Sequence, residues 1–158
     1  MLRRTLLCLG LALAAAPVAA QTPPAQGRLQ PIRPQTALEQ AFIAAYRSEA
    51  ARPAFREQFL ESNVLLVMES DARDAEPRLT DVPGGRTAMI FTSAELLNRR
   101  LGPATPRTAM NGRAALMRVR QNHVVINAGY EPMLVLDPAG IDGFLGIPAS
   151  PEAAGPSQ

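Results

Sequence analysis

The chain has 158 residues and a formal net charge of +2, from 16 basic residues that are all arginine and 14 acidic residues. This length allows one domain with tails at its ends. Because the chain has no lysine, one histidine and one cysteine, its composition excludes a Gly-Lys-Ser/Thr phosphate loop and a zinc site of clustered cysteine and histidine ligands.

Residues 1–20 have the pattern of a secretory signal peptide. Arg3 and Arg4 form a positive n-region, residues 5–16 an apolar h-region, and residues 18–20 a small-residue cleavage site, which predicts cleavage after Ala20. The apolar run is too short to span a bilayer, so we expect no transmembrane segment in the mature chain. The predicted location is therefore the periplasm or the space outside the cell.

Removal of the signal peptide changes the charge and the redox chemistry of the chain. Arg3, Arg4 and Cys8 leave with it, so that 16 − 2 = 14 arginines face 14 acidic residues. A nearly neutral chain argues against a nucleic-acid partner. Without cysteine the mature chain can form no disulfide, even in an oxidising compartment, and its apolar core alone must hold the fold.

The mature chain is predicted to begin with a linker and a capped helix. Residues 21–35 contain four prolines and no apolar periodicity, which predicts a flexible, partly extended linker. Thr36 and Glu39 have the spacing of a capping box that opens a first helix. The buried face of this helix is expected to hold Leu38, Phe42, Ala45 and Tyr46, which recur at helical spacing.

A second helix and a first strand are predicted next. Pro53 suits the first turn of a helix, and Phe55 and Phe59 stand four residues apart, so they share one face. The continuous apolar run at residues 64–68 predicts a central strand. Residues 69–77 are acidic and without periodicity, which indicates a surface loop.

The middle of the chain predicts a hairpin followed by a helix. Residues 78–82 and 86–91 flank a Pro-Gly-Gly turn, and glycine supplies the backbone conformation that such a turn needs. Thr92 and Glu95 have the spacing of a second capping box, which predicts a third helix. Residues 105–110 fit either a short edge strand or an irregular segment.

Two more capped helices are predicted in the last third. Asn111 can cap a helix over residues 112–120, with Ala115, Leu116 and Val119 facing inward. Asp137 can cap a last short helix over residues 138–145. Residues 148–158 are small and proline-rich, which predicts a disordered tail.

The stretch from His123 to Pro138 organises the predicted fold. Its two apolar runs, residues 124–126 and 133–136, flank a polar turn and predict two strands at the core. The folded unit spans residues 36–147, a size at which one core is feasible. The expected fold class is α+β, a single domain with a mixed β-sheet of about five strands and flanking short helices.

The order of these features is shared with a known family. The matching stretches are ARPAFREQFLESNVLLV at residues 51–67, GGRTAMIFTSAELLNRR at residues 84–100 and NHVVINAGYEPMLVLDPAGIDGFL at residues 122–145. Over roughly residues 36–147 the chain resembles the SseB protein N-terminal domain family. The chain departs from the family at Ala128, where relatives usually have proline, and in its signal peptide, since many relatives look cytoplasmic.

The resemblance implies a compact α/β module of a kind often associated with protein–protein contact. The family name links it to serine sensitivity and to secretion. The family has no established enzymatic activity and no agreed catalytic residues, so the resemblance implies no active site in this chain.

The residues themselves also predict no active site. No Gly-x-Ser-x-Gly motif occurs, and His123, at the start of a strand, is expected to be structural. Asp71, Asp74 and Glu76 share one loop but lack the spacing of a calcium-binding loop. We therefore predict no catalytic residue, no metal site and no cofactor, and a protein that is not an enzyme.

Charge is segregated along the chain. Residues 57–81 hold seven acidic residues against two arginines, whereas residues 96–130 hold six arginines and no acidic residue. The arginines can form a face that docks an acidic protein or an anionic envelope surface, or the two regions can face each other within the fold. The six arginines are Arg99, Arg100, Arg107, Arg113, Arg118 and Arg120.

Two functional hypotheses follow. The first is an exported, non-enzymatic protein-interaction module whose arginine face contacts the partner. The alternative is a small-anion or small-ligand binding protein that uses backbone amides of the turn from Asn127 to Gly129. An exposed apolar patch edged by those arginines would favour the first hypothesis, and a closed pocket with convergent polar groups would favour the second. An enzyme with an unrecognised site is the third and weakest hypothesis.

Overall fold

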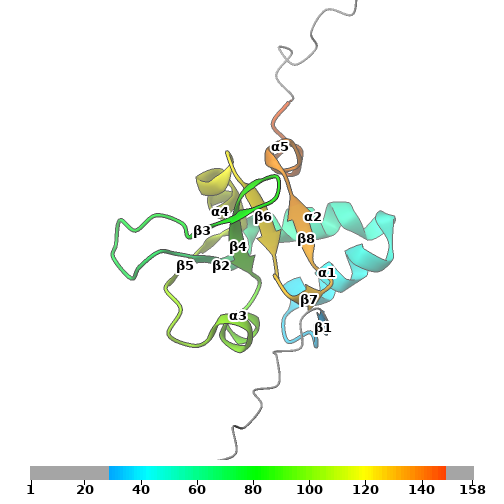
Figure 1. The fold of residues 1–158 in the computed structure, drawn as a ribbon. Coiled ribbons are helices and arrows are strands. Elements are labelled where there is room, and N and C mark those ends of the chain that lie inside the picture. The colour runs from blue at the N-terminus through cyan, green and yellow to red at the C-terminus, as the bar shows by residue number, and fades with distance from the viewer. Residues whose placement is uncertain (1–28, 149–158) are drawn as a thin grey trace, which may run out of the picture.

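The computed structural model describes residues 29–148. The predicted signal peptide, residues 21–28 of the predicted linker and residues 149–158 of the predicted tail lie outside the described residues. The described chain is a single α+β domain built around one mixed sheet (Figure 1), which confirms the predicted fold class.

The main sheet has six strands, one more than predicted, and five of them lie side by side in the order β5-β2-β4-β6-β8. The sixth, β3, pairs with the first half of β4, which is long enough to pair with β2 through its second half. All of these pairings are antiparallel except that of β4 with β6, which is parallel. The strands are β2 (Asn63–Val67), β3 (Leu79–Val82), β4 (Gly85–Phe91), β5 (Arg107–Asn111), β6 (His123–Ile126) and β8 (Leu134–Leu136).

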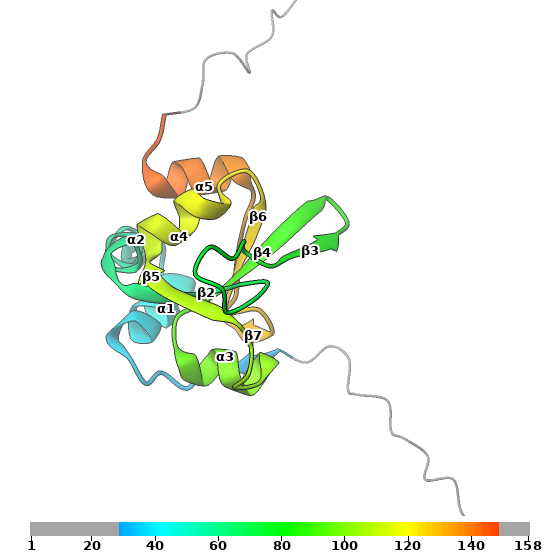
Figure 2. The same cartoon turned by 90° about the vertical axis from the view of Figure 1, so that its left-hand side faces the viewer.

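Within residues 29–148, five α-helices accompany the sheet. Figure 2 shows α1, α2, α4 and α5 on one side of it, whereas α3 lies apart from them at the bottom of the view. A short 3-10 turn over Glu49–Ala51 joins the first two helices. The helices are α1 (Ala37–Arg47), α2 (Arg52–Glu61), α3 (Ala94–Leu101), α4 (Gly112–Val119) and α5 (Pro138–Leu145).

Local sequence signals account for most helix starts. The capping box of Thr36 and Glu39 is present, with both reciprocal hydrogen bonds. The side chains of Asn111 and Asp137 accept hydrogen bonds from the first turns of α4 and α5. Because each of these caps satisfies backbone N–H groups that a helix end leaves unpaired, the three predicted helix starts are confirmed.

The second predicted capping box, of Thr92 with Glu95, is wrong by one residue. Ser93 is the N-cap of α3, and its hydroxyl accepts from the backbone N–H of Leu96 at 3.4 Å. Thr92 is buried, and its hydroxyl is hydrogen-bonded to Asn127 instead. Either residue type can cap a helix, and the tertiary partner of Thr92 decides between them.

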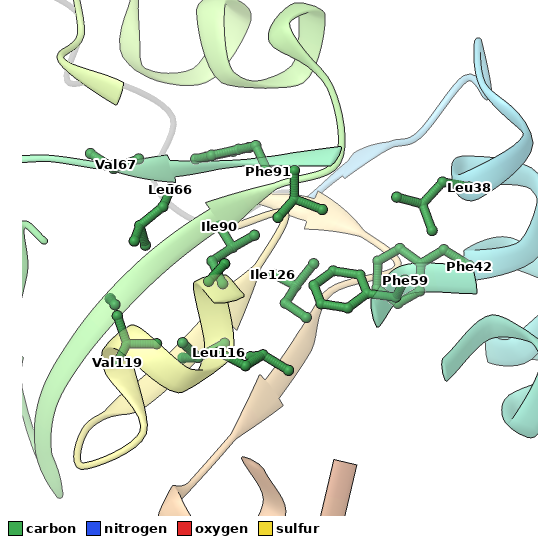
Figure 3. Packing of buried hydrophobic residues seen from close by; sticks show 14 of the residues in the cluster. Leu38, Phe42, Phe59, Leu66, Val67, Ile90, Phe91, Leu116, Val119 and Ile126 are labelled. Carbon is green, nitrogen blue, oxygen red and sulfur yellow. The ribbon is translucent and has the colours of Figure 1, made fainter. Parts of the chain in front are cut away.

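Strand register places the core on the face that the larger group of helices covers. Ile90 lies opposite Leu66 on one side and Ile126 on the other, so these three side chains share one face. Figure 3 shows Leu116 of α4 near this row, and all four residues are fully buried. The predicted inward face of α4 and the predicted core strands at residues 64–68 and 124–126 are therefore confirmed. The prediction of a core strand at residues 133–136 is wrong, because β8 is an edge strand in which Val135 is exposed and Leu134 and Leu136 are half-buried.

The segment before α1 is part of the fold. Residues Gln30–Pro31 form a short strand, β1, that pairs in parallel with β7 (Tyr130–Glu131). The backbone N–H of Ile32 donates to the carbonyl of Glu131 at 2.9 Å, and the Ile32 side chain is buried in the core. The prediction of a flexible linker over residues 21–35 is therefore wrong at residues 30–32, because a backbone ladder there needs no side-chain pattern.

Candidate functional site

The six arginines predicted as a partner contact lie on three different elements. Arg99 and Arg100 are in the last turn of α3, and Arg107 is in the edge strand β5. Arg113 and Arg118 are in α4, and Arg120 follows it as the C-cap. The structure therefore spreads these residues over α3, β5 and α4 and does not gather them on one element.

Several of these arginines are occupied within the fold. Arg118 Nη2 donates to the carbonyl of Ala75 at 2.5 Å, which ties α4 to the acidic loop. Arg120 forms a two-pronged ion pair with Asp142 of α5, at 2.5 and 3.0 Å. Asp142 lies outside the acidic region at residues 57–81, and Arg118 meets that region through a backbone carbonyl. Within residues 29–148, no ion pair joins residues 57–81 to residues 96–130.

The other arginines differ in their surroundings. Arg99 pairs with Glu95 one helical turn away, and Arg107 donates to Asn98 Oδ1 at 2.8 Å. Arg100 lies so close to Gly129 that a Cβ built on this glycine would be 2.5 Å from Arg100 Nε. Arg113 is exposed, and within residues 29–148 it forms no ion pair.

The predicted ligand-binding turn is a structural clamp. Asn127 is fully buried, and its Oδ1 accepts from the backbone N–H and the hydroxyl of Thr92 at 3.0 and 3.1 Å. Its backbone N–H donates to the carbonyl of Ile90 at 2.8 Å, and the carbonyl of Gly129 accepts from Gln30. The proposed ligand role of Asn127 is corrected, because its side chain and its amide are both used inside the fold.

Tyr130 completes this buried polar region. Its hydroxyl donates to the carbonyl of Leu96 in α3 at 2.9 Å. Burial raises the pKa of Tyr130, and the charges of Arg99 and Arg100 partly offset this rise. The region therefore joins α3 to the strand ends of the sheet and serves the fold.

The predicted structural histidine lies at the edge of the hairpin. His123 is half-buried at the start of β6, opposite Thr87, and its ring lies beside Gly85. Among residues 29–148, no group of three or more His, Cys, Asp and Glu side chains is placed to hold a metal ion.

Sequence reasoning missed an apolar groove of about 730 Å³ between the α1–α2 pair, β8 and α5. Its floor is aromatic. Phe42 and Phe55 stack with ring centroids 4.8 Å apart, and Phe144 meets Phe55 edge-on at 6.2 Å. Contacts of this type are preferred aromatic geometries, so helices from both ends of the chain build one preformed surface.

The rim of the groove is exposed. Tyr46 of α1 is 59% exposed and Met133, just before β8, is 37% exposed. The Tyr46 hydroxyl donates to Glu131 Oε1 at 3.3 Å, which holds the ring at the rim. Tyr46 had been predicted on the buried face of its helix, and this prediction is wrong.

The groove carries an excess of positive charge. Arg52 forms an exposed ion pair with Glu49 at 2.9 Å, and Arg56 Nε donates to the carbonyl of Phe144 at 2.5 Å. No carboxylate of the described chain forms an ion pair with Arg56. Two guanidinium groups therefore line the groove with one carboxylate.

A second, polar hollow of about 380 Å³ lies between the acidic loop, the β3–β4 hairpin and α4. Glu69, Glu76, Arg86 and Arg118 line it. Because Arg118 there holds the loop through the carbonyl of Ala75, the hollow is stabilised as part of the connection between α4 and the loop.

No helix of the described chain has both the length and the apolar character needed to cross a membrane.

The sequence of the chain matches a known protein family. A match to the family described as SseB protein N-terminal domain covers residues 38–142, more than half of the chain. No curated protein and no solved structure matches the chain. The matched residues begin in α1 and end in α5, so they include the main sheet and the residues that line the groove, except Phe144. The chain belongs to the SseB protein N-terminal domain family.

Proposed function

We propose that the chain is a non-enzymatic protein-interaction module that works after export, in the periplasm or outside the cell. The observation that carries the proposal is the aromatic groove beside β8, with Tyr46 and Met133 exposed at its rim. Large apolar side chains left in water cost free energy, and a partner that covers them recovers it. In this proposal the groove, and not the arginine-bearing elements, is the main contact.

The form of the groove favours a protein segment over a small ligand. Its rim residues Tyr46 and Met133 are exposed, so the groove is open to solvent and an occupant can be longer than the groove. Aromatic and methionine side chains are also enriched where proteins bind each other. The polar groups that a small-ligand site would need to fix an orientation are few here, since Arg56 is already used by α5.

The buried polar residues Thr92, Asn127 and Glu39 contribute to the fold and are not part of the proposed contact. Thr92 and Asn127 satisfy each other, and Glu39 Oε2 accepts from the backbone N–H groups of Gln35 and Thr36 at 2.7 and 3.2 Å. Within residues 29–148, the buried side-chain atom left without a partner is Glu39 Oε1. Each of these residues therefore has a place in a cap or a clamp, as structural polar groups do.

The test is site-specific photocrosslinking of the full chain in the cells that produce it. A crosslinking amino acid replaces Met133 in one variant and Met117, which is exposed on α4 away from the groove, in the control. We expect one discrete adduct from position 133, recovered from the periplasm or the medium, and none of the same mass from position 117. Identical adducts from both positions, or none from either, would contradict the proposal.

The export part of the proposal has its own measurement. The intact mass of the chain recovered from outside the cytoplasm should correspond to a polypeptide that begins at Gln21, because cleavage is expected after Ala20. Recovery of the chain from the cytosol with residues 1–20 still attached would contradict export but would not contradict the proposed contact at the groove.

A further inference from the structure

Resting on the proposed function, we infer that the partner contributes a short extended segment that adds as a strand to the free edge of β8. The segment carries a run of apolar side chains, and next to the run it carries a carboxylate that faces Arg52 and Arg56. The sheet edge, the two faces beside it and the charge of the groove each contribute to this inference.

The free edge of β8 is the first observation. In the described sheet β8 is the last strand and pairs only with β6, through Leu134–Leu136. An edge strand has backbone N–H and C=O groups without partners, and an extended peptide can pair with them. Pro132 and Pro138 bound this stretch, and proline cannot donate to a ladder. The added ladder is therefore limited to about five residues.

The second observation is that the aromatic groove lies beside this edge. Leu134 lines the groove and is in register with buried Ile126, so it points to the helix-covered face. Figure 1 shows the α1–α2 pair next to β8 on that side. A strand added to β8 continues the pleat of the sheet, so every second side chain of the segment would point to Phe42 and Phe55.

The opposite face of the same edge is also apolar and open. Val135 points to that face and is 54% exposed. It continues a row with Val125 and Met89, which are in register with it across β6 and β4 and are both half-buried. The intervening side chains of an added strand would cover Val135. Both faces of the segment should therefore be apolar, which means consecutive apolar residues.

Charge selects the residue next to this run. Arg52 is paired with Glu49, and Glu131 lies at the rim beside Tyr46, whereas Arg56 forms no ion pair within residues 29–148. A carboxylate on the partner complements Arg56. After cleavage, the segments of the chain outside the described residues, 21–28 and 149–158, contain no large apolar residue. They cannot supply the apolar run, so the occupant is a segment of another protein.

The test begins with selection of random displayed peptides of about nine residues on the full chain. We expect enrichment of peptides with at least three consecutive apolar, β-branched or aromatic residues next to an acidic residue. Enrichment of apolar residues three and four apart would indicate a helix in the groove and would overturn the inference. A selection that enriches no pattern would overturn it as well.

N-methylated versions of the selected peptide then test which of its backbone amides pair with β8. N-methylation of one amide at a time should weaken binding about tenfold or more at alternate positions and leave the positions between them unchanged, because only every second amide of an edge-paired strand faces β8. Equal losses at all positions would overturn strand addition.

Analytical ultracentrifugation of the free chain tests whether a second copy of the chain occupies the edge of β8. A dimer that the peptide dissociates would assign the edge to a second copy and would overturn the inference.

Two variants locate the binding surface. Met133→Asp at the rim should weaken binding of the selected peptide about tenfold or more, whereas Met117→Asp, at a more exposed position on α4, should leave it unchanged. Arg52→Glu should weaken the peptide several-fold and restore binding to a version whose acid is replaced by lysine. If the cellular adduct at position 133 forms but these peptide results fail, the strand inference is wrong and the proposed function stands.

Discussion

Asn127 and Thr92 join the carboxyl ends of β6 and β4, the parallel pair in the middle of the sheet. Asn127 Oδ1 accepts from the backbone N–H of Thr92 at 3.0 Å, and Asn127 Nδ2 lies 3.0 Å from the Thr92 hydroxyl. Both residues are buried. Because each satisfies the other, neither leaves an unpaired polar group in the core. The contact also fixes where α3 begins, since Thr92 immediately precedes the cap of that helix.

Removal of the Asn127 side chain should destabilise the fold. Asn127→Gly leaves the Thr92 amide buried without its partner, and we expect a loss of about 1–3 kcal/mol in the free energy of unfolding. Asn127→Ala should lose about 1 kcal/mol more, because Asn127 has a φ of 57° and alanine is strained in this left-handed conformation. Urea denaturation measures both. Asn63→Ala, at an exposed site in β2, is the control and should change stability by less than about 0.5 kcal/mol.

The sequence identified Asn127 as a turn residue but assigned it to a ligand. The turn follows from local chemistry, since asparagine tolerates a left-handed backbone. Its burial does not, because the residue that satisfies it lies 35 positions earlier in the chain. The helices with local caps and the strands with continuous apolar runs could be predicted because the residues that specify them lie within a few positions of each other. The contact between Asn127 and Thr92 has no such local signal.

Two glycines in helices should respond to alanine with opposite signs. A Cβ on Gly112, at the start of α4, would lie 2.2 Å from the carbonyl oxygen of Phe59. Gly112→Ala should therefore lower the free energy of unfolding by about 1–3 kcal/mol, because backbone must move. A Cβ on Gly143 in α5 would meet no atom within 4 Å, so Gly143→Ala should raise it by about 0.5 kcal/mol through helix propensity. Chemical denaturation decides, and equal effects at both sites would contradict the close packing of α2 and α4.

The groove shows a second limit of sequence reasoning. Helical spacing placed Phe42 and Tyr46 on one apolar face, and Phe42 is buried as expected whereas Tyr46 is exposed. Periodicity states which residues share a face but not how far the neighbouring layer extends over it. Phe42 is covered by Phe55 of α2, with ring centroids 4.8 Å apart, whereas Tyr46 lies at the open rim of the groove. The signal in the sequence was an apolar face on this helix that extends as far as Tyr46, beyond the residues that the neighbouring elements bury.

The segment before α1 provides the next prediction. Ile32 is only 6% exposed and follows a strand of two residues, so Ile32→Ala should cost about 2 kcal/mol or more in the free energy of unfolding. Leu29→Ala, three residues earlier and exposed, should cost less than about 0.5 kcal/mol. Thermal or urea melts of the two variants give the comparison. Equal stability of the two variants would show that residues 30–32 do not stabilise the fold and are part of the linker.

The ion pair between Arg120 and Asp142 should make stability depend on pH in a defined direction. The hydrogen bond from Arg120 holds the pKa of Asp142 below its usual value in the folded chain. The folded state therefore binds fewer protons than the unfolded state between these two pKa values. The resulting stabilisation is fully present above the usual aspartate pKa and is lost as the pH falls through the lowered one.

Asp142→Asn should accordingly be less stable than the natural chain near neutral pH, and the difference should shrink as the pH falls below about 4. Urea denaturation over a series of pH values measures this difference. Asp71→Asn, in the exposed acidic loop and without an ion pair among residues 29–148, is the matched control, and its curve should run parallel to that of the natural chain. A difference between Asp142→Asn and the natural chain that stays constant down to strongly acidic pH would show that the carboxylate charge does not stabilise the contact between α4 and α5.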